Sequence, residues 1–453
     1  MRELYDIIRD KDRVLLENIP EAALSDTLGR RRGTAQALVY PLSTEEVSAV
    51  MRFAWKNRIP VTPRGAGTNL VGSTVPDGGI ILDLSRMNRI LEVDLETFTA
   101  TAEPGVLLQD FQAKVESMGL FYPPDPGEKA STLGGNIATN AGGMRAVKYG
   151  VTRDYVRGLT VVLANGDVVE MGSKNVKDAS GLDLKQLIVG SEGTLAVITR
   201  CLLRLVGRPE YSLTALVPFA SLHEGIRSVP AILQAGLHPT AVEFVERSVV
   251  VLGERFTGLS YPCPEAEAYL LLTFDGRRED IEDRVERARE LVLRHGALDV
   301  VALRDPVRAT EIWRVRGCLV KAVEAISEQE PVDIVVPIDK ISDFVAFVHQ
   351  VEKENNIRMV AFGHAGDGNV HLCVMRGERS EEDWNRDLGA CMERIYGEAF
   401  RLGGVTSGEH GIGLSKRLYY LSHTSDVKLA VQRCVKDALD ERHILNDHKS
   451  YLA

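Results

Sequence analysis

Three histidines in glycine-rich surroundings have the types and spacing of a metal site. His364 and His371 lie in the run Val360–Val374, where a glycine-rich turn between two β-rich stretches predicts a strand, a tight turn and a second strand. Neighbouring strands would bring both imidazoles within reach of one ion. Glu409 and His410 add a carboxylate and a third imidazole on a second glycine-rich segment. Two imidazoles and one carboxylate form an open site for a divalent metal, whereas any one of these histidines alone is more typical of a structural residue.

Three glycine-rich loops indicate a phosphorylated ligand. The first, Pro63–Ser73, follows the strand-like run Ile59–Thr62, and the others span 131–143 and 189–199. Because glycine lacks a Cβ, several backbone N–H groups can converge on one phosphate, although the first loop alone is nearly as typical of an ordinary turn. Its Gly-x-Gly-x-x-x-x-Gly spacing also differs from the Gly-x-Gly-x-x-Gly of a Rossmann fold. Three such loops together could line one long, flat, phosphorylated ligand.

The elements that must position these residues predict an α+β protein. Residues 1–50 have the charge pattern of amphipathic helices, which end in the strand-like run Ala37–Tyr40 and a helix start at Ser43–Glu46. Short β-rich runs separated by glycine loops continue to about residue 208. Beyond that point, strand-like runs such as Asp333–Pro337 alternate with charged helices such as Arg277–His295. The stretch Ser415–Arg442 is again helical. The expected domains are 1–208, 209–408 and 409–453.

The composition disfavours nucleic-acid-binding, membrane-spanning and secreted proteins. The 453 residues carry 54 basic and 64 acidic side chains without a Lys/Arg stripe, which disfavours nucleic-acid binding. No apolar run approaches the ~18 residues of a membrane helix. The charged start Met1–Asp6 is not typical of a signal peptide, so we expect a cytoplasmic protein. The six cysteines include no Cys-x-x-Cys pair, which excludes a Cys-ligated iron–sulfur cluster within the chain.

The three loops, with Tyr122–Pro126 ahead of the second, resemble the FAD-binding domain of the vanillyl-alcohol-oxidase/PCMH-type flavoproteins. From about Val39 to His448 the chain resembles the FAD-linked oxidases of the glycolate oxidase, D-lactate dehydrogenase and D-2-hydroxyglutarate dehydrogenase group. This resemblance implies a PCMH-type FAD-binding domain of two α/β subdomains. It also implies an α+β substrate or cap domain with an antiparallel sheet, and a C-terminal helical segment that packs at the active site and the FAD domain.

The resemblance assigns FAD contacts to the loops. The first would wrap the pyrophosphate with backbone N–H groups, the second would line the isoalloxazine side and the pyrophosphate, and the third would hold the adenosine half. Some relatives attach FAD covalently through a histidine in the first loop, and because this loop has none we expect non-covalent FAD. The residues expected to bind FAD are Arg64, Gly65, Ala66, Gly67, Thr68, Asn69, Gly72, Ser73, Pro124, Thr132, Gly134, Gly135, Asn136, Ala138, Glu192, Gly193 and Ile198.

The resemblance also implies roles for the histidine cluster. His364, His371 and Glu409 would be ligands of a divalent metal, with zinc expected and iron or manganese as alternatives. The cation would chelate the hydroxyl and carboxylate of a 2-hydroxy acid and lower the pKa of the hydroxyl. His410 would take the hydroxyl proton, and the Cα hydride would pass to flavin N5. Arg316 matches the family's Trp-x-x-Arg segment and would clamp the substrate carboxylate, with a surface arginine on a helix as the alternative.

Two positions depart from the D-2-hydroxyglutarate dehydrogenases. Val320 and Pro331 stand where those enzymes have a threonine and a lysine, so a second substrate carboxylate lacks its expected partners unless Lys321 compensates. We therefore predict an FAD-dependent dehydrogenase of a small D-2-hydroxy acid, with D-lactate or glycolate favoured. A D-2-hydroxyglutarate dehydrogenase and a flavin subunit that only relays electrons are the alternatives. A zinc hydrolase and an NAD-dependent Rossmann enzyme are disfavoured by the loops.

The chain lacks an iron–sulfur motif, a membrane segment and a plain NAD fingerprint. We therefore expect a protein electron acceptor, such as an electron-transfer flavoprotein or an iron–sulfur subunit, with direct use of oxygen as the alternative. A homodimer is compatible with the sequence.

Overall fold

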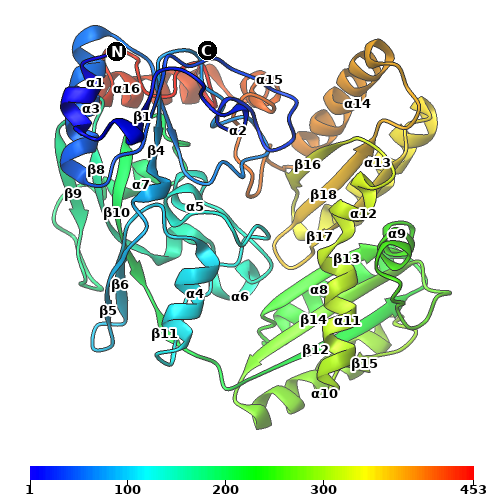
Figure 1. Ribbon diagram of the computed structural model, residues 1–453. Coiled ribbons are helices and arrows are strands. Elements are labelled where there is room, and N and C mark those ends of the chain that lie inside the picture. The colour runs from blue at the N-terminus through cyan, green and yellow to red at the C-terminus, as the bar shows by residue number, and fades with distance from the viewer. Residues whose placement is uncertain (453) are drawn as a thin grey trace. The chain divides into compact units, whose positions relative to one another are not determined.

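The computed structural model describes residues 1–452, which form two compact units (Figure 1). The first unit comprises Met1–Gly142, Val151–Arg208 and the chain from Glu409 onward. The second comprises Gly143–Gly150 and Pro209–Gly408. The chain thus passes between the units after Gly142, Gly150, Arg208 and Gly408.

The first unit contains two larger sheets and a small antiparallel sheet of β7 and β11. One larger sheet has the order β1-β2-β4-β3, in which β4 pairs in parallel with both β2 and β3. The other larger sheet is antiparallel, with the order β5-β6-β10-β8-β9. The two larger sheets correspond to the two subdomains expected for the FAD-binding domain. The strands are β1 Val14–Leu15, β2 Ala37–Val39, β3 Val61–Arg64, β4 Ile80–Asp83, β5 Ile90–Asp94, β6 Thr99–Ala102, β7 Leu120–Phe121, β8 Val156–Val162, β9 Val168–Gly172, β10 Val197–Arg204 and β11 Val206–Gly207.

Helix α3 (Thr44–Asn57) covers the mixed sheet β1-β2-β4-β3 of the first unit. Ser43 caps its first turn by accepting a hydrogen bond from the backbone N–H of Glu46 at 3.3 Å. Its apolar face packs with β2, β3 and β4 in one buried core, which also includes Leu445 from the C-terminal segment. The other helices of this unit are α1 Leu4–Ile8, α2 Glu21–Leu24, α4 Leu108–Glu116, α5 Leu133–Thr139, α7 Lys185–Ile188, α15 Arg417–Ser422 and α16 Asp426–Leu439.

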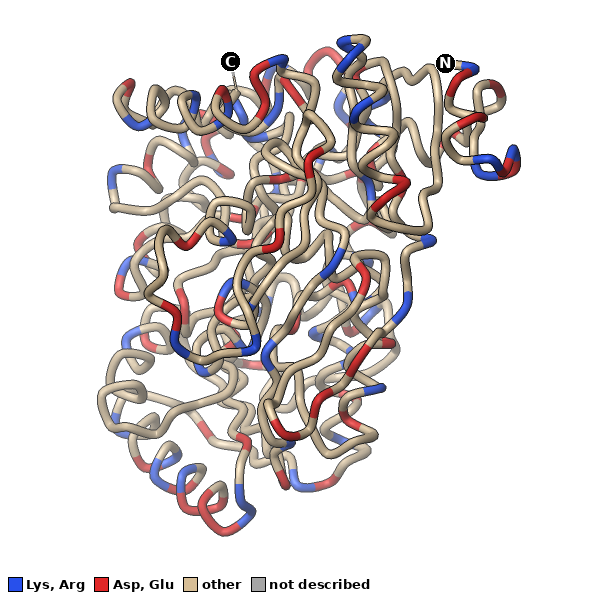
Figure 2. Tube along the Cα trace, turned by 90° about the vertical axis from the view of Figure 1, so that its left-hand side faces the viewer, with Lys and Arg blue, Asp and Glu red and all other residues tan. Residues whose placement is uncertain are grey.

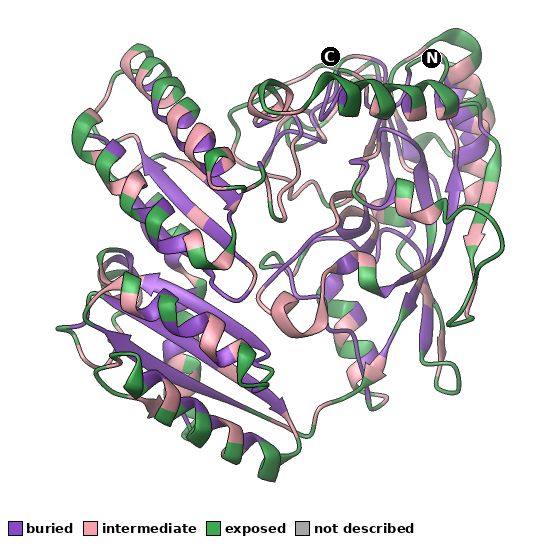
Figure 3. Cartoon of the chain, turned by 180° about the vertical axis from the view of Figure 1, so that it is seen from behind, coloured by how far each residue is buried: buried purple, intermediate pink, exposed green. Residues whose placement is uncertain are grey.

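The second unit is built on an antiparallel sheet of seven strands, in the order β15-β12-β14-β13-β17-β18-β16. Its strands are largely buried, whereas its helices expose their outer faces (Figure 3). The strands are β12 Tyr211–Phe219, β13 Ala241–Glu246, β14 Ala268–Gly276, β15 Val301–Ala302, β16 Gln329–Val335, β17 Met359–His364 and β18 Asn369–Met375. The helices are α6 Ala146–Tyr149, α8 Leu222–Gln234, α9 Arg247–Thr257, α10 Arg278–Arg294, α11 Pro306–Gly317, α12 Leu319–Glu324, α13 Ile341–Asn355 and α14 Glu381–Arg401.

Helices α9, α11 and α12 pack together on one face of this seven-stranded sheet. Their apolar side chains share a core with Tyr269, Phe362 and Cys373 of the sheet. This layer carries Arg316 in the last turn of α11. The α+β fold class, with an antiparallel cap sheet and a C-terminal helical segment, is therefore confirmed.

The strand expected at 37–40 and the helix start expected at Ser43 are confirmed as β2 and the N-cap of α3, but the amphipathic helices expected before them are wrong over most of their length. Before α3, only α1, with 5 residues, and α2, with 4 residues, are α-helical in this stretch. Pro20 lies before α2 and Pro41 follows β2, and the chain at Gly33 lies so close to the carbonyl of Pro76 that a Cβ would overlap it. Charge density without a continuous apolar face does not make a helix.

The distribution of charged residues and the hydropathy of the helices can be examined in the structure. Acidic and basic segments alternate along the trace in the view of Figure 2. No helix within residues 1–452 is long and apolar enough to cross a membrane. All six cysteines are free thiols.

Candidate functional site

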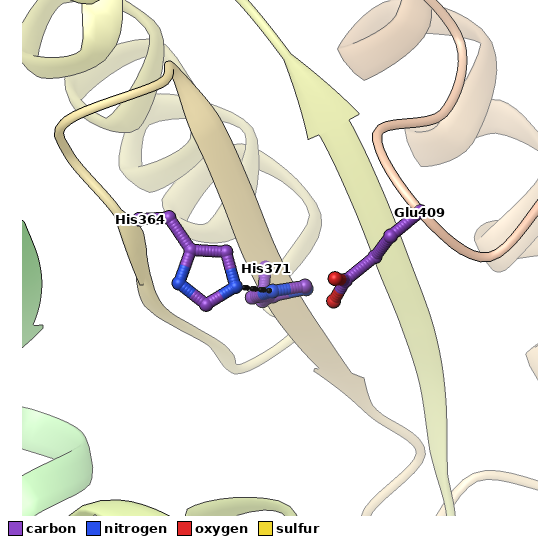
Figure 4. A group of neighbouring side chains, drawn as sticks. All are labelled: His364, His371 and Glu409. Carbon is purple, nitrogen blue, oxygen red and sulfur yellow. Dashed lines mark hydrogen bonds between the residues drawn. The ribbon is translucent and has the colours of Figure 1, made fainter. Parts of the chain in front are cut away.

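The hairpin of β17 and β18 brings His364 and His371 together. His364 ends β17, and His371 lies on β18 opposite Phe362. The turn between them has Gly368 at φ +85°, a conformation that glycine adopts without strain. The two Nε2 atoms are 3.2 Å apart, with the rings nearly perpendicular (Figure 4).

Glu409 is held beside this hairpin through the residue before it. The backbone N–H of Gly408 donates to both carboxylate oxygens of Asp333, at 3.2 and 3.1 Å, and Ser407 Oγ donates to the same carboxylate at 2.6 Å. Asp333 lies on β16 directly opposite His371 on β18. Since Glu409 is covalently next to Gly408, its position follows from this anchor. His364, His371 and Glu409 each offer one ligand atom, all within 4.8 Å of one another.

These three residues fit a divalent cation. Two imidazole nitrogens bound to one tetrahedral zinc at about 2.0–2.1 Å would lie about 3.3 Å apart. The observed Nε2–Nε2 distance of 3.2 Å is close to that value. Zinc, iron and manganese all accept two nitrogens and one carboxylate oxygen, so the donor set fits any of them.

Glu243 links the histidine pair to Arg316. Its Oε1 accepts a 2.6 Å hydrogen bond from Nδ1 of His364, and its Oε2 accepts one of 2.6 Å from Nη2 of Arg316. Glu243 is fully buried, and the guanidinium of Arg316 also lies over the ring of Phe362, 4.9 Å from its centroid. Burial alone would raise the pKa of Glu243, but its electrostatic interactions and hydrogen bonds with His364 and Arg316 outweigh burial and lower that pKa.

The three glycine-rich loops contact one another within the first unit. A Cβ on Gly65 would overlap Thr132 Oγ1, which places the first loop against the second. The backbone N–H of Glu192 donates to Ala138 O at 2.7 Å, which joins the third loop to α5 of the second. Ser73 Oγ then donates to Glu192 Oε2 at 2.5 Å and connects the first loop to the third.

Buried polar atoms around these loops have no hydrogen-bond partner among residues 1–452. They are Nε and Nη1 of Arg64, Oγ1 of Thr74 and Oγ of Ser131. Nη2 of Arg64 donates to Ala22 O at 2.7 Å, and its Nε is 3.8 Å from Asp83 Oδ2. Buried donors without partners carry a large desolvation penalty, so this region fits a polar, phosphate-bearing ligand.

Two family models match the chain. The FAD binding domain matches residues 35–172, and the C-terminal domain of the FAD linked oxidases matches residues 208–450. The chain belongs to the FAD-linked oxidase family. Its glycine-rich first unit thus carries the family's FAD-binding region, and the protein is a flavin-dependent oxidoreductase.

Curated relatives cover nearly the whole chain. D-Lactate dehydrogenase of Anaerostipes hadrus is 43% identical over 422 residues, which are 91% of this chain and 89% of the relative. Glycolate oxidase subunit GlcD of Bacillus subtilis is 37% identical over 94% of this chain and 91% of the relative. D-2-Hydroxyglutarate dehydrogenase of Stutzerimonas stutzeri is 32% identical over 92% of this chain and 91% of the relative.

Solved structures share the fold at low sequence identity. p-Cresol methylhydroxylase superposes with a TM-score of 0.82 at 16% identity, covering 100% of this chain and 96% of that chain. A 4-ethylphenol oxidase from Gulosibacter chungangensis gives a TM-score of 0.79 at 19% identity, with 100% and 96% coverage. This FAD-linked oxidase therefore has the fold of these proteins.

The residues expected to bind FAD occupy several kinds of position. Asn69 shapes its own loop, because its Oδ1 accepts from the backbone N–H groups of Val71 and Ser73 at 3.0 and 2.9 Å. Thr132 caps α5 by accepting from Gly135 N at 3.3 Å. The others lie on the three loops, on α5, before the second loop or on β10: Arg64, Gly65, Ala66, Gly67, Thr68, Gly72, Ser73, Pro124, Gly134, Asn136, Ala138, Glu192, Gly193 and Ile198.

His410, the expected base, follows Glu409 directly. Its side chain is 19% exposed, and its Nε2 is 3.9 Å from Glu409 Oε1. Its backbone carbonyl accepts a 3.3 Å hydrogen bond from Asn69 Nδ2, on the first glycine-rich loop.

Glu243 and Asp333 were not singled out from the sequence. An acidic residue inside the apolar run Ala-Val-Glu-Phe-Val was the available signal for Glu243. Asp333 stood inside the expected strand 333–337, and its partners lie far along the chain. Asn369 also belongs to this network, since its Nδ2 donates to Asp333 Oδ1 at 2.7 Å.

Proposed function

We propose that this FAD-linked oxidase converts a small D-2-hydroxy monocarboxylate, with D-lactate or glycolate favoured, into the 2-keto acid. Relatives named for D-lactate, glycolate and D-2-hydroxyglutarate support a 2-hydroxy acid as the substrate class. The observation that carries the proposal is that Glu243 binds both Arg316 and His364. One residue therefore holds both Arg316, which can attract a substrate carboxylate, and His364, which can bind a cation.

In the proposed oxidation of the hydroxy acid, each group of residues has a separate role. Bound FAD supplies the two-electron acceptor, and a cation held by His364, His371 and Glu409 would make the substrate hydroxyl more acidic. His410 takes the proton of that hydroxyl, since an imidazole accepts protons near neutral pH. Arg316 holds the substrate carboxylate with its planar guanidinium, whose Nε is buried without a partner among the described residues.

Substrate size follows from the surroundings of Arg316. On α12, Val320 offers no charge and Lys321 is exposed. Pro331 lies on β16 opposite Cys373 and offers no side-chain donor. A second substrate carboxylate thus has no cationic partner at the two departing positions, which favours monocarboxylates. D-2-Hydroxyglutarate is the alternative substrate, with Lys321 as its partner.

The electrons leave to a protein acceptor in this proposal, such as an electron-transfer flavoprotein or an iron–sulfur subunit. The free cysteines are scattered along the chain and offer no cluster ligands of their own. The alternative, a flavin subunit that only relays electrons, predicts no reduction by any hydroxy acid.

Anaerobic flavin bleaching tests the proposal. Purified holoenzyme is mixed with D-lactate, L-lactate, glycolate, D-2-hydroxyglutarate and 2-hydroxybutyrate, each with and without a metal chelator. We expect D-lactate or glycolate to bleach the flavin fastest and chelation to slow that reduction. Fastest reduction by D-2-hydroxyglutarate would support the alternative substrate, and no reduction by any of the acids would favour the electron relay.

A further inference from the structure

We propose that Glu243 is a positioning residue that fixes the hydrogen of the His364 imidazole on Nδ1. Arg316 acts through Glu243, because the hydrogen bond that it donates decides which atom of residue 243 faces His364. This inference rests on the proposed function only in taking His364 as a metal ligand. It makes the anion-binding arginine and the metal-binding histidine two ends of one hydrogen-bonded unit.

The geometry leaves Glu243 no other arrangement. Glu243 on β13 pairs in register with His364 on β17, so both side chains emerge on the same face of the sheet. Arg316 reaches that face from α11 and is 8% exposed. Both hydrogen bonds to the carboxylate are 2.6 Å long, and each uses a different oxygen. The carboxylate therefore has one oxygen for each neighbour.

The chemistry of these groups sets the proton on His364. An ionised carboxylate only accepts hydrogen bonds, so Nδ1 of His364 must carry the hydrogen. In the neutral imidazole, Nε2 then has a lone pair, and Nε2 is the atom that faces His371 at 3.2 Å. A metal requires that lone pair, and carboxylate partners commonly fix it in this way.

Glutamine at position 243 would reverse the arrangement. Its amide has one accepting oxygen and one donating nitrogen, whereas the guanidinium of Arg316 can only donate. The amide oxygen must therefore face Arg316, and the amide nitrogen must face Nδ1 of His364. Nδ1 becomes an acceptor, the hydrogen moves to Nε2, and the lone pair needed by a metal is lost.

Removing Arg316 as well would restore the original tautomer. With methionine at position 316, the amide oxygen introduced at position 243 can turn and accept from Nδ1 of His364. The double variant E243Q/R316M should thus bind metal better than E243Q, although it carries one more substitution. A residue that only supports packing predicts the opposite order.

The test measures Zn²⁺ affinity of chelator-treated, FAD-loaded enzyme by competition with a chromophoric chelator. Wild type, E243Q, R316M and E243Q/R316M are compared, with FAD content and thermal unfolding recorded for each. We expect Zn²⁺ binding by E243Q to weaken about 10- to 100-fold, the usual effect of losing such a partner. E243Q should be the weakest of the four proteins, and the double variant should recover at least about tenfold of that loss.

Glu246→Gln is the matched control. Glu246 lies on the same strand and also binds a histidine, His349 Nε2, at 2.8 Å. The substitution Glu246→Gln should leave the Zn²⁺ affinity unchanged. Should E243Q fail to fold, E243Q/R316M is compared with E243L/R316M, which has no acceptor for His364 and should bind Zn²⁺ more weakly.

Three results would overturn the inference. They are wild-type Zn²⁺ affinity in E243Q, no recovery in the double variant, and equal affinity of E243Q/R316M and E243L/R316M. Zn²⁺ is measured without a hydroxy acid, so failure of every acid to reduce the flavin would contradict the proposed function and leave the tautomer result standing. Absence of Zn²⁺ binding by the wild type would overturn both.

Discussion

The hydroxyl of Ser73 donates a 2.5 Å hydrogen bond to Glu192 Oε2 and so joins the first glycine-rich loop to the third. The backbone N–H of Gly413 donates to the same oxygen at 2.8 Å. Oε1 accepts from Ile412 N at 3.0 Å and from Ser450 Oγ at 2.9 Å. One buried carboxylate thus ties two of the glycine-rich loops to two segments near the C-terminus.

We predict that Glu192→Gln weakens FAD binding and destabilises the first unit. The amide nitrogen would face two donors that now share one oxygen, and each buried donor left unpaired costs about 1–3 kcal/mol. FAD retention after dialysis and urea unfolding measure the two effects. Asp183→Asn, an exposed acidic site in the same unit, is the control. Full FAD retention together with wild-type unfolding in E192Q would refute this role.

Gly65→Ala should release FAD without unfolding the protein. A Cβ on Gly65 would overlap Thr132 Oγ1, the atom that caps α5, so the two loops must separate. Such overpacking typically costs about 1–3 kcal/mol. Gly127→Ala provides the control, because nothing lies within 4 Å of its added Cβ. Equal FAD affinity in both variants would show that the close approach of the loops is dispensable.

The parts of the site formed by short segments were predictable from the sequence. The hairpin that pairs His364 with His371 is made of consecutive residues, so its glycine turn was sufficient to predict it. By contrast, Glu243 is 121 residues from His364 and meets it only through the register of β13 and β17. No local sequence pattern encodes that register. The one sequence signal was that Glu243 is an acidic residue within an apolar strand.

Two expected elements show where local patterns fail. The strand expected at 333–337 is Gln329–Val335, because it pairs with β18 along its whole length and ends where Pro337 follows. Residues 1–43 are mostly irregular, since they pack by close backbone contacts, as at Gly33 against Pro76 O, rather than through an amphipathic face. Both outcomes depend on contacts with distant chain segments.

His371→Ala should abolish substrate-driven flavin reduction while leaving FAD bound. The substitution removes one of the two imidazole nitrogens that lie 3.2 Å apart, and the glycine-rich loops that we propose bind FAD belong to the first unit. We expect the oxidised flavin spectrum to persist, and anaerobic D-lactate to bleach it at least about 100-fold more slowly. His295→Ala, at an exposed position after α10, should behave as wild type. Unchanged reduction in H371A would refute the metal role.

We predict that Arg316→Lys weakens substrate binding and has a smaller effect on the bound flavin. Lysine keeps the charge but loses the planar fork of donors, so it cannot serve Glu243 and a substrate carboxylate in the same geometry. We expect KM for D-lactate to rise about 10- to 100-fold, as for the loss of one charged hydrogen bond. Arg314→Lys, exposed on the same helix, is the control. An unchanged KM in R316K would contradict the carboxylate clamp.

His349 should stabilise the second unit in a pH-dependent way. Its Nε2 and Nδ1 each lie 2.8 Å from a carboxylate, of Glu246 and Glu352 respectively. These hydrogen bonds, that of Glu246 first, raise the pKa of His349 from 6.5 to about 10. Below pH 6.5 both folded and unfolded chains bind the proton and the stabilisation is complete, and it is lost as pH rises through about 10.

The measurement is the difference in unfolding free energy between wild type and His349→Gln across that pH range. We expect the difference to be largest near pH 6 and to shrink steadily toward pH 10, because the unfolded state releases its proton first. His295→Gln, an exposed histidine in the same unit, should show no such trend. A difference between wild type and H349Q that stays constant with pH would mean that His349 contributes through packing, and that its two carboxylate partners do not hold its proton.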